Sequence, residues 1–255
     1  MVDRRVAGLP LEQVIGWAEF CGLRIAVDPE VFVPRLRTEF LVAQALLLLL
    51  ARGDDPPGPP DHGGAARPPV PPWPGPRKGA GGREIVVDLC CGVGAIGAAL
   101  AVAVDRVEVY AVDLDPAAVA CARRNLEGFT AQVYEGDLYE PLPVALRGRV
   151  ALVVANVPYV PTGEIDLLPV EAREYEPRIA LDGGPDGLDV LRRVAAGAPG
   201  WLAPGGYLLI ETSERQAPQA VAAFAAAGLV PRMVSSADLN ATVVIGTGPA
   251  GSGTS

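Results

Sequence analysis

Residues 87–97 have the sequence Val-Asp-Leu-Cys-Cys-Gly-Val-Gly-Ala-Ile-Gly, which matches the pattern Gly-x-Gly-x-x-Gly. The apolar run 85–89 before the glycines predicts a buried strand, and the small residues of 95–104 predict a helix. Small residues let the backbone approach a ligand closely, and the first turn of a helix has free N–H groups. The stretch therefore predicts a strand, a ligand-binding loop and a helix. A tight packing turn without a ligand is the alternative.

Strand and helix patterns alternate from this loop almost to the end of the chain. Further strands are predicted at 107–112, 132–134, 150–155, 207–211, 229–234 and 241–246, and further helices at 116–125, 188–198 and 218–227. This alternation predicts a parallel sheet with helices on both faces. The last two strands have no helix between them, which predicts one antiparallel strand at an edge. The fold class is therefore α/β, a doubly wound, mostly parallel, seven-stranded, Rossmann-like sheet.

The region before the loop predicts an appendage and an insertion. Helical spacing over 11–18 and alternation over 23–33 predict a short helix and a hairpin with its turn at 28–30, within an N-terminal region of residues 1–37. We expect Thr38 to cap a helix that runs to about Ala51. The main domain is then 38–247, with a flexible Pro/Gly-rich insertion at 54–82 and a disordered tail at 248–255.

Composition restricts the function classes. The 255 residues carry a net charge of -9 with a pI near 4.7, so the chain lacks the basic field of a nucleic-acid binder. The longest apolar stretch, 40–51, is too short to cross a bilayer, and no apolar leader follows the first residues. The four cysteines lack zinc-ligand spacing, and the only histidine, His62, lies in the Pro/Gly-rich segment. We therefore expect a cytoplasmic monomer with reduced thiols, no metal, no stable nucleic acid and no membrane anchor.

Two acidic residues follow later strands. Asp113 ends the second predicted strand, about 20 residues after the glycine loop, where a carboxylate can accept both hydroxyls of a ribose. Asp137 follows the third strand, where it could accept from the exocyclic amine of an adenine, with Leu138 against the ring. Capping for Asp113 and an ordinary loop role for Asp137 are the alternatives, and Asp115 is expected to cap the helix that Pro116 begins. The pattern fits a nicotinamide cofactor as well as S-adenosylmethionine.

Residues 152–161, Leu-Val-Val-Ala-Asn-Val-Pro-Tyr-Val-Pro, separate these two cofactors. The buried strand ends at Asn156, and a dehydrogenase has no need of the tetrapeptide 156–159. A planar nitrogen is a poor nucleophile because its lone pair is delocalised into the neighbouring π system. Accepting its two N–H bonds, at the Asn156 side-chain oxygen and a following backbone carbonyl, would fix it, and Tyr159 would stack on the planar group. This predicts methyl transfer to such a nitrogen; an asparagine that only caps a turn is the alternative.

These motifs resemble the class I S-adenosylmethionine-dependent methyltransferases, and most of all the peptide-chain-release-factor glutamine N5-methyltransferase family. The resemblance runs from about Gly8 to Gly246 and includes Val-Pro-Arg-Leu-Arg-Thr-Glu at 33–39 and Glu-Tyr-Glu-Pro-Arg-Ile-Ala-Leu at 174–181. It implies that the substrate is the glutamine side-chain amide of a Gly-Gly-Gln loop in a translation release factor, and that S-adenosylmethionine is the cofactor.

The resemblance also implies a role for each motif residue. Asn156 and Tyr159 would be catalytic, and substrate would bind at Asn156, Val157, Pro158 and Tyr159. The methionine moiety of the cofactor would lie on the glycine loop, the ribose at Asp113 and the adenine at Asp137. The implied cofactor-binding residues are Cys90, Cys91, Gly92, Val93, Gly94, Asp113, Asp137, Leu138 and Asn156.

The chain departs from the family at several points. Val157 stands where proline is usual, which keeps the carbonyl but leaves a less rigid backbone. Cys90-Cys91 replace a glycine and a small polar residue, and we expect Cys90 to narrow the pocket. Only 32 residues precede Val33, so we expect most of the family's N-terminal docking domain to be absent, and the 54–82 insertion is unlike typical members. N-methylation of an exocyclic amine in RNA or DNA, and a non-catalytic cofactor-binding subunit, are the competing functions.

Overall fold

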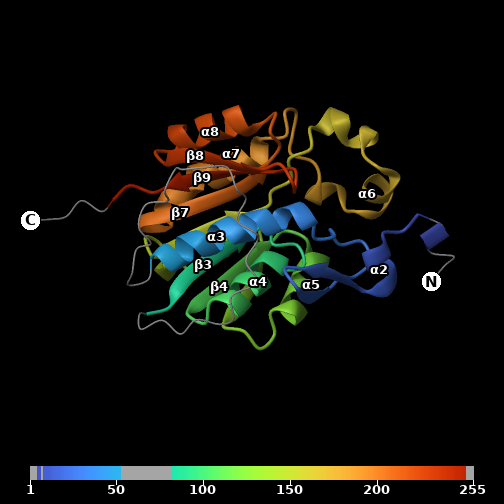
Figure 1. The fold of residues 1–255 in the computed structure, drawn as a ribbon, viewed down its shortest axis with the longest axis horizontal. Helices are drawn as coiled ribbons and strands as arrows, with labels where there is room; N and C mark the ends of the chain where they lie inside the picture. The colour runs from blue at the N-terminus through green and yellow to red at the C-terminus, as the bar shows by residue number, and fades with distance from the viewer. Residues whose placement is uncertain (1–4, 7, 53–81, 251–255) are drawn as a thin grey trace, which may run out of the picture.

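A seven-stranded sheet forms the centre of the computed structural model, which describes residues 5–6, 8–52 and 82–250 (Figure 1). The strand order is β5-β4-β3-β6-β7-β9-β8, and β9 alone runs against its neighbours β7 and β8. The doubly wound, mostly parallel sheet is thus confirmed, and its antiparallel strand lies one place inside the edge because β8 pairs on its outer side. The strands are β3 (Glu84–Leu89), β4 (Val107–Asp113), β5 (Ala131–Glu135), β6 (Val150–Ala155), β7 (Leu202–Thr212), β8 (Val230–Ser236) and β9 (Ala241–Thr247).

Helices cover both faces of this sheet (Figure 1). One face carries α3 (Glu39–Ala51), α4 (Ala95–Ala103) and α5 (Pro116–Asn125), and the other carries α7 (Asp189–Gly197) and α8 (Ala217–Ala226). Successive side chains of a strand point to opposite faces, so Leu152 and Val154 pack with the first group while Val153 packs with the second. Every residue of β6 is buried, as its unbroken apolar sequence predicts.

The N-terminal region contains a short helix and a hairpin, α2 (Leu11–Ile15), β1 (Trp17–Phe20) and β2 (Leu23–Ala26). The hairpin turn is Cys21-Gly22, with φ angles of 52° and 71°, and not the predicted 28–30. Two positive φ angles match the right-handed twist of a two-residue hairpin, and glycine adopts one of them without strain. The hairpin is tied to the glycine loop by Asn125, which donates to the carbonyls of Ala26 (2.9 Å) and Val93 (2.8 Å).

Short helical segments that the sequence did not predict connect the larger elements. They are η1 (Leu36–Thr38), η2 (Val144–Leu146), η3 (Thr162–Leu167), α6 (Val170–Tyr175), η4 (Arg178–Ala180) and η5 (Ala198–Gly200). Gly205 and Gly206 of β7 form backbone hydrogen bonds with Pro249 and Gly248, so the first residues of the predicted tail are attached to the sheet. The predicted insertion, except for Gly82, and residues 251–255 lie outside the described residues. None of the described helices has the length and apolar character needed to cross a membrane.

Candidate active site

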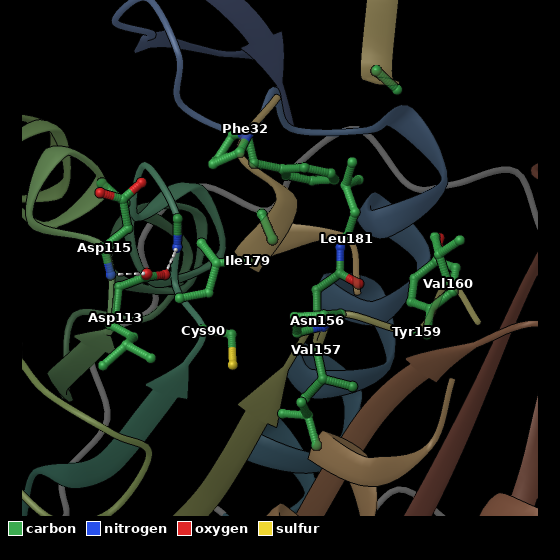
Figure 2. A pocket seen from close by; sticks show the side chains of 18 of the residues that line it. Phe32, Cys90, Asp113, Asp115, Asn156, Val157, Tyr159, Val160, Ile179 and Leu181 are labelled. Atoms are coloured by element: carbon green, nitrogen blue, oxygen red, sulfur yellow. Dashed lines mark hydrogen bonds between the residues drawn. The ribbon is translucent and has the colours of Figure 1, made fainter. Parts of the chain in front are cut away.

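A cavity of about 500 Å³ opens at the carboxyl ends of β3, β4 and β6, where ligands bind in open α/β sheets. Figure 2 shows Asp113 and Asp115 on one side of it, Asn156 and Tyr159 on the other, and Cys90 between them. The lining includes nine predicted residues: Cys90, Gly92, Asp113, Asp137, Leu138, Asn156, Val157, Pro158 and Tyr159. Strands adjacent in the sheet but distant in sequence therefore bring most of the predicted site together.

Asp113 joins the glycine loop to the end of β4. Its Oδ2 accepts from the backbone N–H of Gly92 at 2.7 Å, and its Oδ1 accepts from that of Asp115 at 2.9 Å (Figure 2). Burial raises the pKa of Asp113, while these two N–H groups oppose the rise. A carboxylate oxygen can accept more than one hydrogen bond, so both remain available to ligand hydroxyls. Asp115 caps α5 as expected, since its Oδ1 accepts from the N–H of Ala117 at 2.9 Å.

The glycine loop contributes fewer residues to the cavity than predicted. Cys90 and Gly92 line it, whereas the side chains of Cys91 and Val93 belong to the core beneath the loop. A Cβ on Gly94 would lie 3.1 Å from that of Ala122, so this glycine permits close packing of α4 on α5. Cys91, Val93 and Gly94 are not among the residues that line the cavity, and their contact with the cofactor stays a prediction. Close helix packing and close ligand approach produce the same sequence pattern.

Cys90 has the left-handed φ of 54°, a conformation that favours glycine. Its side chain lies between the two sides of the cavity (Figure 2). Burial, and then the carboxylates Asp113 and Asp88, raise the pKa of this thiol well above its usual range. The thiol therefore stays protonated at neutral pH and acts as a neutral wall of the pocket.

The end of β5 supplies Asp137 and Leu138. The Oδ2 of Asp137 accepts from Arg193 of α7 at 2.6 Å, which leaves its other oxygen free of that ion pair. Leu114, directly after Asp113, also lines the cavity and is 49% exposed. Sequence reasoning missed Leu114, although its place at a strand end, next to a predicted ligand-binding acid, was an available signal.

Asn156 has a side-chain acceptor without a partner among the described residues. Its Nδ2 donates to the Oγ1 of Thr38 at 3.3 Å, while its Oδ1 is buried and has no hydrogen-bond partner among the described residues. A buried polar atom without a partner costs about 1–3 kcal/mol, which a ligand N–H would recover. Thr38 is the N-cap residue of α3, as predicted, but it also ends η1 and its side chain makes no capping bond. The side chain of Val157 is 1% exposed and packs in the core on the α7 face, so its carbonyl is the group suited to a ligand.

Tyr159 is fixed by a neighbour from the N-terminal region. Arg37 donates from Nη2 to its hydroxyl, and the guanidinium lies 5.6 Å from the ring centroid. Burial and the charge of Glu211 raise the pKa of Tyr159 to about 12, against the opposing charge of Arg37. Tyr159 is therefore protonated at neutral pH, so it suits stacking and hydrogen bonding and not proton abstraction.

Comparison with known proteins decides the family. A protein-family model described as Methyltransferase small domain matches residues 79–170. The release factor glutamine methyltransferase of Geobacter sulfurreducens is 37% identical over 230 residues, 89% of this chain and 69% of that protein. The chain belongs to the release factor glutamine methyltransferase family.

Two further comparisons describe this methyltransferase. The "4-amino-L-phenylalanine/4-methylamino-L-phenylalanine methyltransferase" of Streptomyces pristinaespiralis is 35% identical over 227 residues, 89% of this chain and 69% of that protein. A solved methyltransferase from Pyrococcus furiosus superimposes with a TM-score of 0.58 at 14% identity, covering 97% of this chain and 98% of the other. The second comparison confirms the fold alone.

The cofactor of the methyltransferase is S-adenosylmethionine. The residues present fit it, because a glycine loop precedes the N-terminus of α4 and Asp113 keeps free lone pairs in the same cavity. The two family-like segments 33–39 and 174–181 also meet there: Arg35 donates to both carboxylate oxygens of Glu176 at 2.6 Å. Arg35 of this pair lines the cavity, and no sequence pattern indicated the pairing.

Proposed function

We propose that this methyltransferase transfers a methyl group from S-adenosylmethionine to the side-chain nitrogen N5 of a glutamine in a release factor. The observation that carries the proposal is Asn156, which lines the cavity together with Asp113 and whose buried Oδ1 has no hydrogen-bond partner among the described residues. The family's curated members, such as the one from Geobacter sulfurreducens, are named for this activity.

The side chains of the cavity divide into a cofactor side and an amide side. Cys90, Gly92, Asp113, Asp137 and Leu138 would hold S-adenosylmethionine, which supplies an electrophilic methyl group on a sulfonium. On the other side, Asn156 Oδ1 would accept one N–H of the glutamine amide, and the Val157 carbonyl the other.

These two acceptors determine the chemistry. They would orient the amide nitrogen toward the cofactor side and stabilise the positive charge that develops on it as the new N–C bond forms and the methyl–sulfur bond breaks, which would leave a neutral thioether. The Tyr159 ring covers the planar amide and keeps water from it. Each of the two oxygens would hold one N–H during transfer, and one of these two protons would then leave to solvent, which restores a neutral amide.

We also propose that the segments around the opening contact the protein substrate. Three exposed apolar side chains lie on these segments: Leu167 on η3 (80% exposed), Val170 on α6 (54%) and Ile179 on η4 (49%). Residues adjacent in sequence to Leu167 and Val170 line the cavity. Phe32 and Arg35, which also line the cavity, indicate that the N-terminal region forms another wall. Exposed apolar side chains at a cavity opening suit a loop that must bury its tip there.

A second candidate substrate is a small aromatic amine. The relative from Streptomyces pristinaespiralis, 35% identical, is named for 4-amino-L-phenylalanine and 4-methylamino-L-phenylalanine. An amine on an aromatic ring is also planar and conjugated, so the same two acceptors and the same tyrosine would suit it.

Incubation with tritium-labelled S-adenosylmethionine tests the proposal. We offer a release factor, the same factor with its Gly-Gly-Gln glutamine changed to asparagine, 4-amino-L-phenylalanine, and RNA. Label on the first protein alone supports the proposal; label on the amino acid supports the second candidate, and label on RNA alone refutes both.

The variant Asn156→Ala should lose about 10²–10³-fold in kcat, because it removes an acceptor that acts on the developing charge. Its Kd for S-adenosylmethionine, measured by calorimetry, should stay within about twofold, since the cofactor lies on the other side of the cavity. Full activity in this variant would remove Asn156 from the mechanism.

A further inference from the structure

Gln216, the N-cap residue of α8, has a buried side-chain amide to which the proposed mechanism gives no role. The residue is 5% exposed and does not line the cavity. Its Nε2 donates to the backbone carbonyl of Tyr159 at 2.9 Å and to that of Asp186 at 3.0 Å. Its Oε1 accepts from the hydroxyl of Ser213 at 2.6 Å. Both polar atoms of the side chain therefore have partners, as a buried amide requires.

These partners fix the orientation of the amide. Backbone carbonyls can only accept, so the NH₂ group of Gln216 and not its oxygen must face them. On the other side, the hydroxyl of Ser213 can donate its proton to the amide oxygen. Exchanging the two ends of the amide would set an oxygen against two carbonyl oxygens. Gln216 is therefore a double donor aimed at two separate segments of main chain.

The two segments lie main chain against main chain. The N–H of Val160 donates to the carbonyl of Leu181 at 3.0 Å, and the N–H of Gly183 donates to the carbonyl of Val160 at 2.9 Å. A Cβ on Gly183 would lie only 2.7 Å from the carbonyl oxygen of Pro158. Gln216 joins these segments from a third element, α8. The end of the tetrapeptide is therefore attached to the facing loop and to α8 together.

This attachment lies close to a proposed substrate acceptor. The carbonyl of Val157, which we propose accepts one N–H of the substrate amide, is two residues before the carbonyl of Tyr159. Pro158 lies between them, and its ring fixes its own φ and restricts the residue before it. A shift of the Tyr159 carbonyl therefore passes to the Val157 carbonyl. A misplacement of about 1 Å can cost about 10²-fold in rate.

We propose that Gln216 is a positioning residue that fixes the main chain of the tetrapeptide by donating to the carbonyls of Tyr159 and Asp186. The second carbonyl is itself held in place, because the side chain of Asp186 accepts from the N–H of Leu188 at 3.1 Å and from Arg192 at 2.6 Å. The effect of Gln216 on turnover rests on the proposed function, whereas its hold on the main chain does not.

The first measurement follows the main chain and needs no substrate. Gln216→Leu keeps a side chain of similar size and removes both donors. In this variant the N–H of Val160 should exchange with solvent at least about tenfold faster in NMR spectra, because its segment has lost an attachment. The N–H of Val154, inside the fully buried β6, should exchange at its wild-type rate. An equal rise at both positions would indicate a general loss of stability and would overturn the local role.

Turnover provides the second measurement. Gln216→Leu should lose about 10–100-fold in kcat, while the Kd of S-adenosylmethionine stays within about twofold, because the cofactor side of the cavity is untouched. The calorimetric stoichiometry of cofactor binding counts the folded molecules, so kcat is expressed per folded molecule. A variant that merely folded less well would show a lower stoichiometry and an unchanged kcat.

Gln216→Glu separates positioning from packing. Glutamate has nearly the shape of glutamine, but its ionised form would set negative charge against two carbonyl oxygens. Its protonated form can donate one hydrogen bond, and burial favours that form. The kcat of this variant relative to wild type should therefore rise at least about fivefold as the pH falls from about 9 to about 6. Other titrating groups are common to both proteins, so the ratio reports on the new carboxyl.

Gln219→Glu is the matched control. Gln219 lies three residues further along α8 and is exposed. The same change of an amide to a carboxylate at this position should alter neither kcat nor its dependence on pH.

The outcomes separate this inference from the proposed function. Unchanged exchange at Val160, wild-type kcat in Gln216→Leu, or a Gln216→Glu activity ratio independent of pH would each overturn the positioning role. A wild-type protein that methylates no release factor, together with faster Val160 exchange in Gln216→Leu, would refute the function and support the hold on the main chain. Should Gln216→Leu fail to fold, Gln216→Glu still decides, because its protonated carboxyl keeps one donor.

Discussion

Replacing Gly187 with alanine should slow turnover, although Gly187 does not line the cavity. Gly187 has a φ of 76°, and a Cβ there would lie 2.3 Å from the carbonyl oxygen of Tyr159 and 2.4 Å from Nε2 of Gln216. That same amide nitrogen donates to the Tyr159 carbonyl at 2.9 Å. The added methyl would therefore press on the backbone of the tetrapeptide 156–159, which we propose binds the substrate.

The distances give the size of the effect. Ordinary contact for a Cβ begins near 3.4 Å. The carbonyl must therefore retreat by about 1 Å, and a displacement of that size costs about 10²-fold in rate. The left-handed φ costs alanine about 1–2 kcal/mol, and weakening the Gln216 bond about 0.5–1.5 kcal/mol. For a chain of this length the melting temperature should fall by roughly 3–14 °C.

Gly228→Ala is the control, since Gly228 has a φ of 80° and a Cβ there would meet nothing within 4 Å. It carries the same backbone strain without the contact, so its Tm should fall by roughly 2–8 °C while kcat stays at the wild-type value. We would measure kcat with saturating labelled cofactor and Tm by calorimetry for both variants. Wild-type kcat in Gly187→Ala, or equal losses in the two variants, would refute the reasoning.

Three further substitutions test other features of the site. Asp113→Ala should weaken binding of S-adenosylmethionine about 10–100-fold by calorimetry, because it removes a charged acceptor; an unchanged Kd would exclude the ribose role. Cys90→Gly should raise Tm by roughly 2–8 °C by relieving the left-handed strain at φ 54°, and an unchanged Tm would show that no strain is present. Burial raises the pKa of Asp88 from 3.8 to about 7, although a hydrogen bond from the backbone N–H of Gly97 opposes the rise. Between these two pH values the folded state keeps a proton on Asp88 that the unfolded state has lost. The free energy of unfolding of wild type relative to Asp88→Asn should therefore fall as pH rises from about 4 to 7 in urea titrations, and a constant difference would contradict this.

The sequence alone was enough to predict the sheet and the two strand ends, at Asp113 and Asn156, that lie on opposite sides of the cavity (Figure 2). Apolar period and turn residues are local properties, so the alternation of strands and helices, the fully buried β6, and the positions of Asp113 and Asn156 at strand ends were all predictable. A local sequence pattern was not sufficient where the same pattern is compatible with two different structural roles. Gly94 permits close packing of α4 on α5, which the ligand-loop pattern did not indicate, and the hairpin turn is Cys21-Gly22 and not the predicted 28–30.

Only the tertiary structure decided how the site is held together. Arg37 and Glu211 are 174 residues apart, Thr38 and Asn156 are 118 apart, and no window of sequence contains both partners of either pair. Their contact depends on the strand order, which places the end of β7 beside the end of β6, and on η1 lying across both. A sequence pattern specifies which residue ends a strand, whereas the direction in which its side chain is turned depends on neighbours that folding alone brings together.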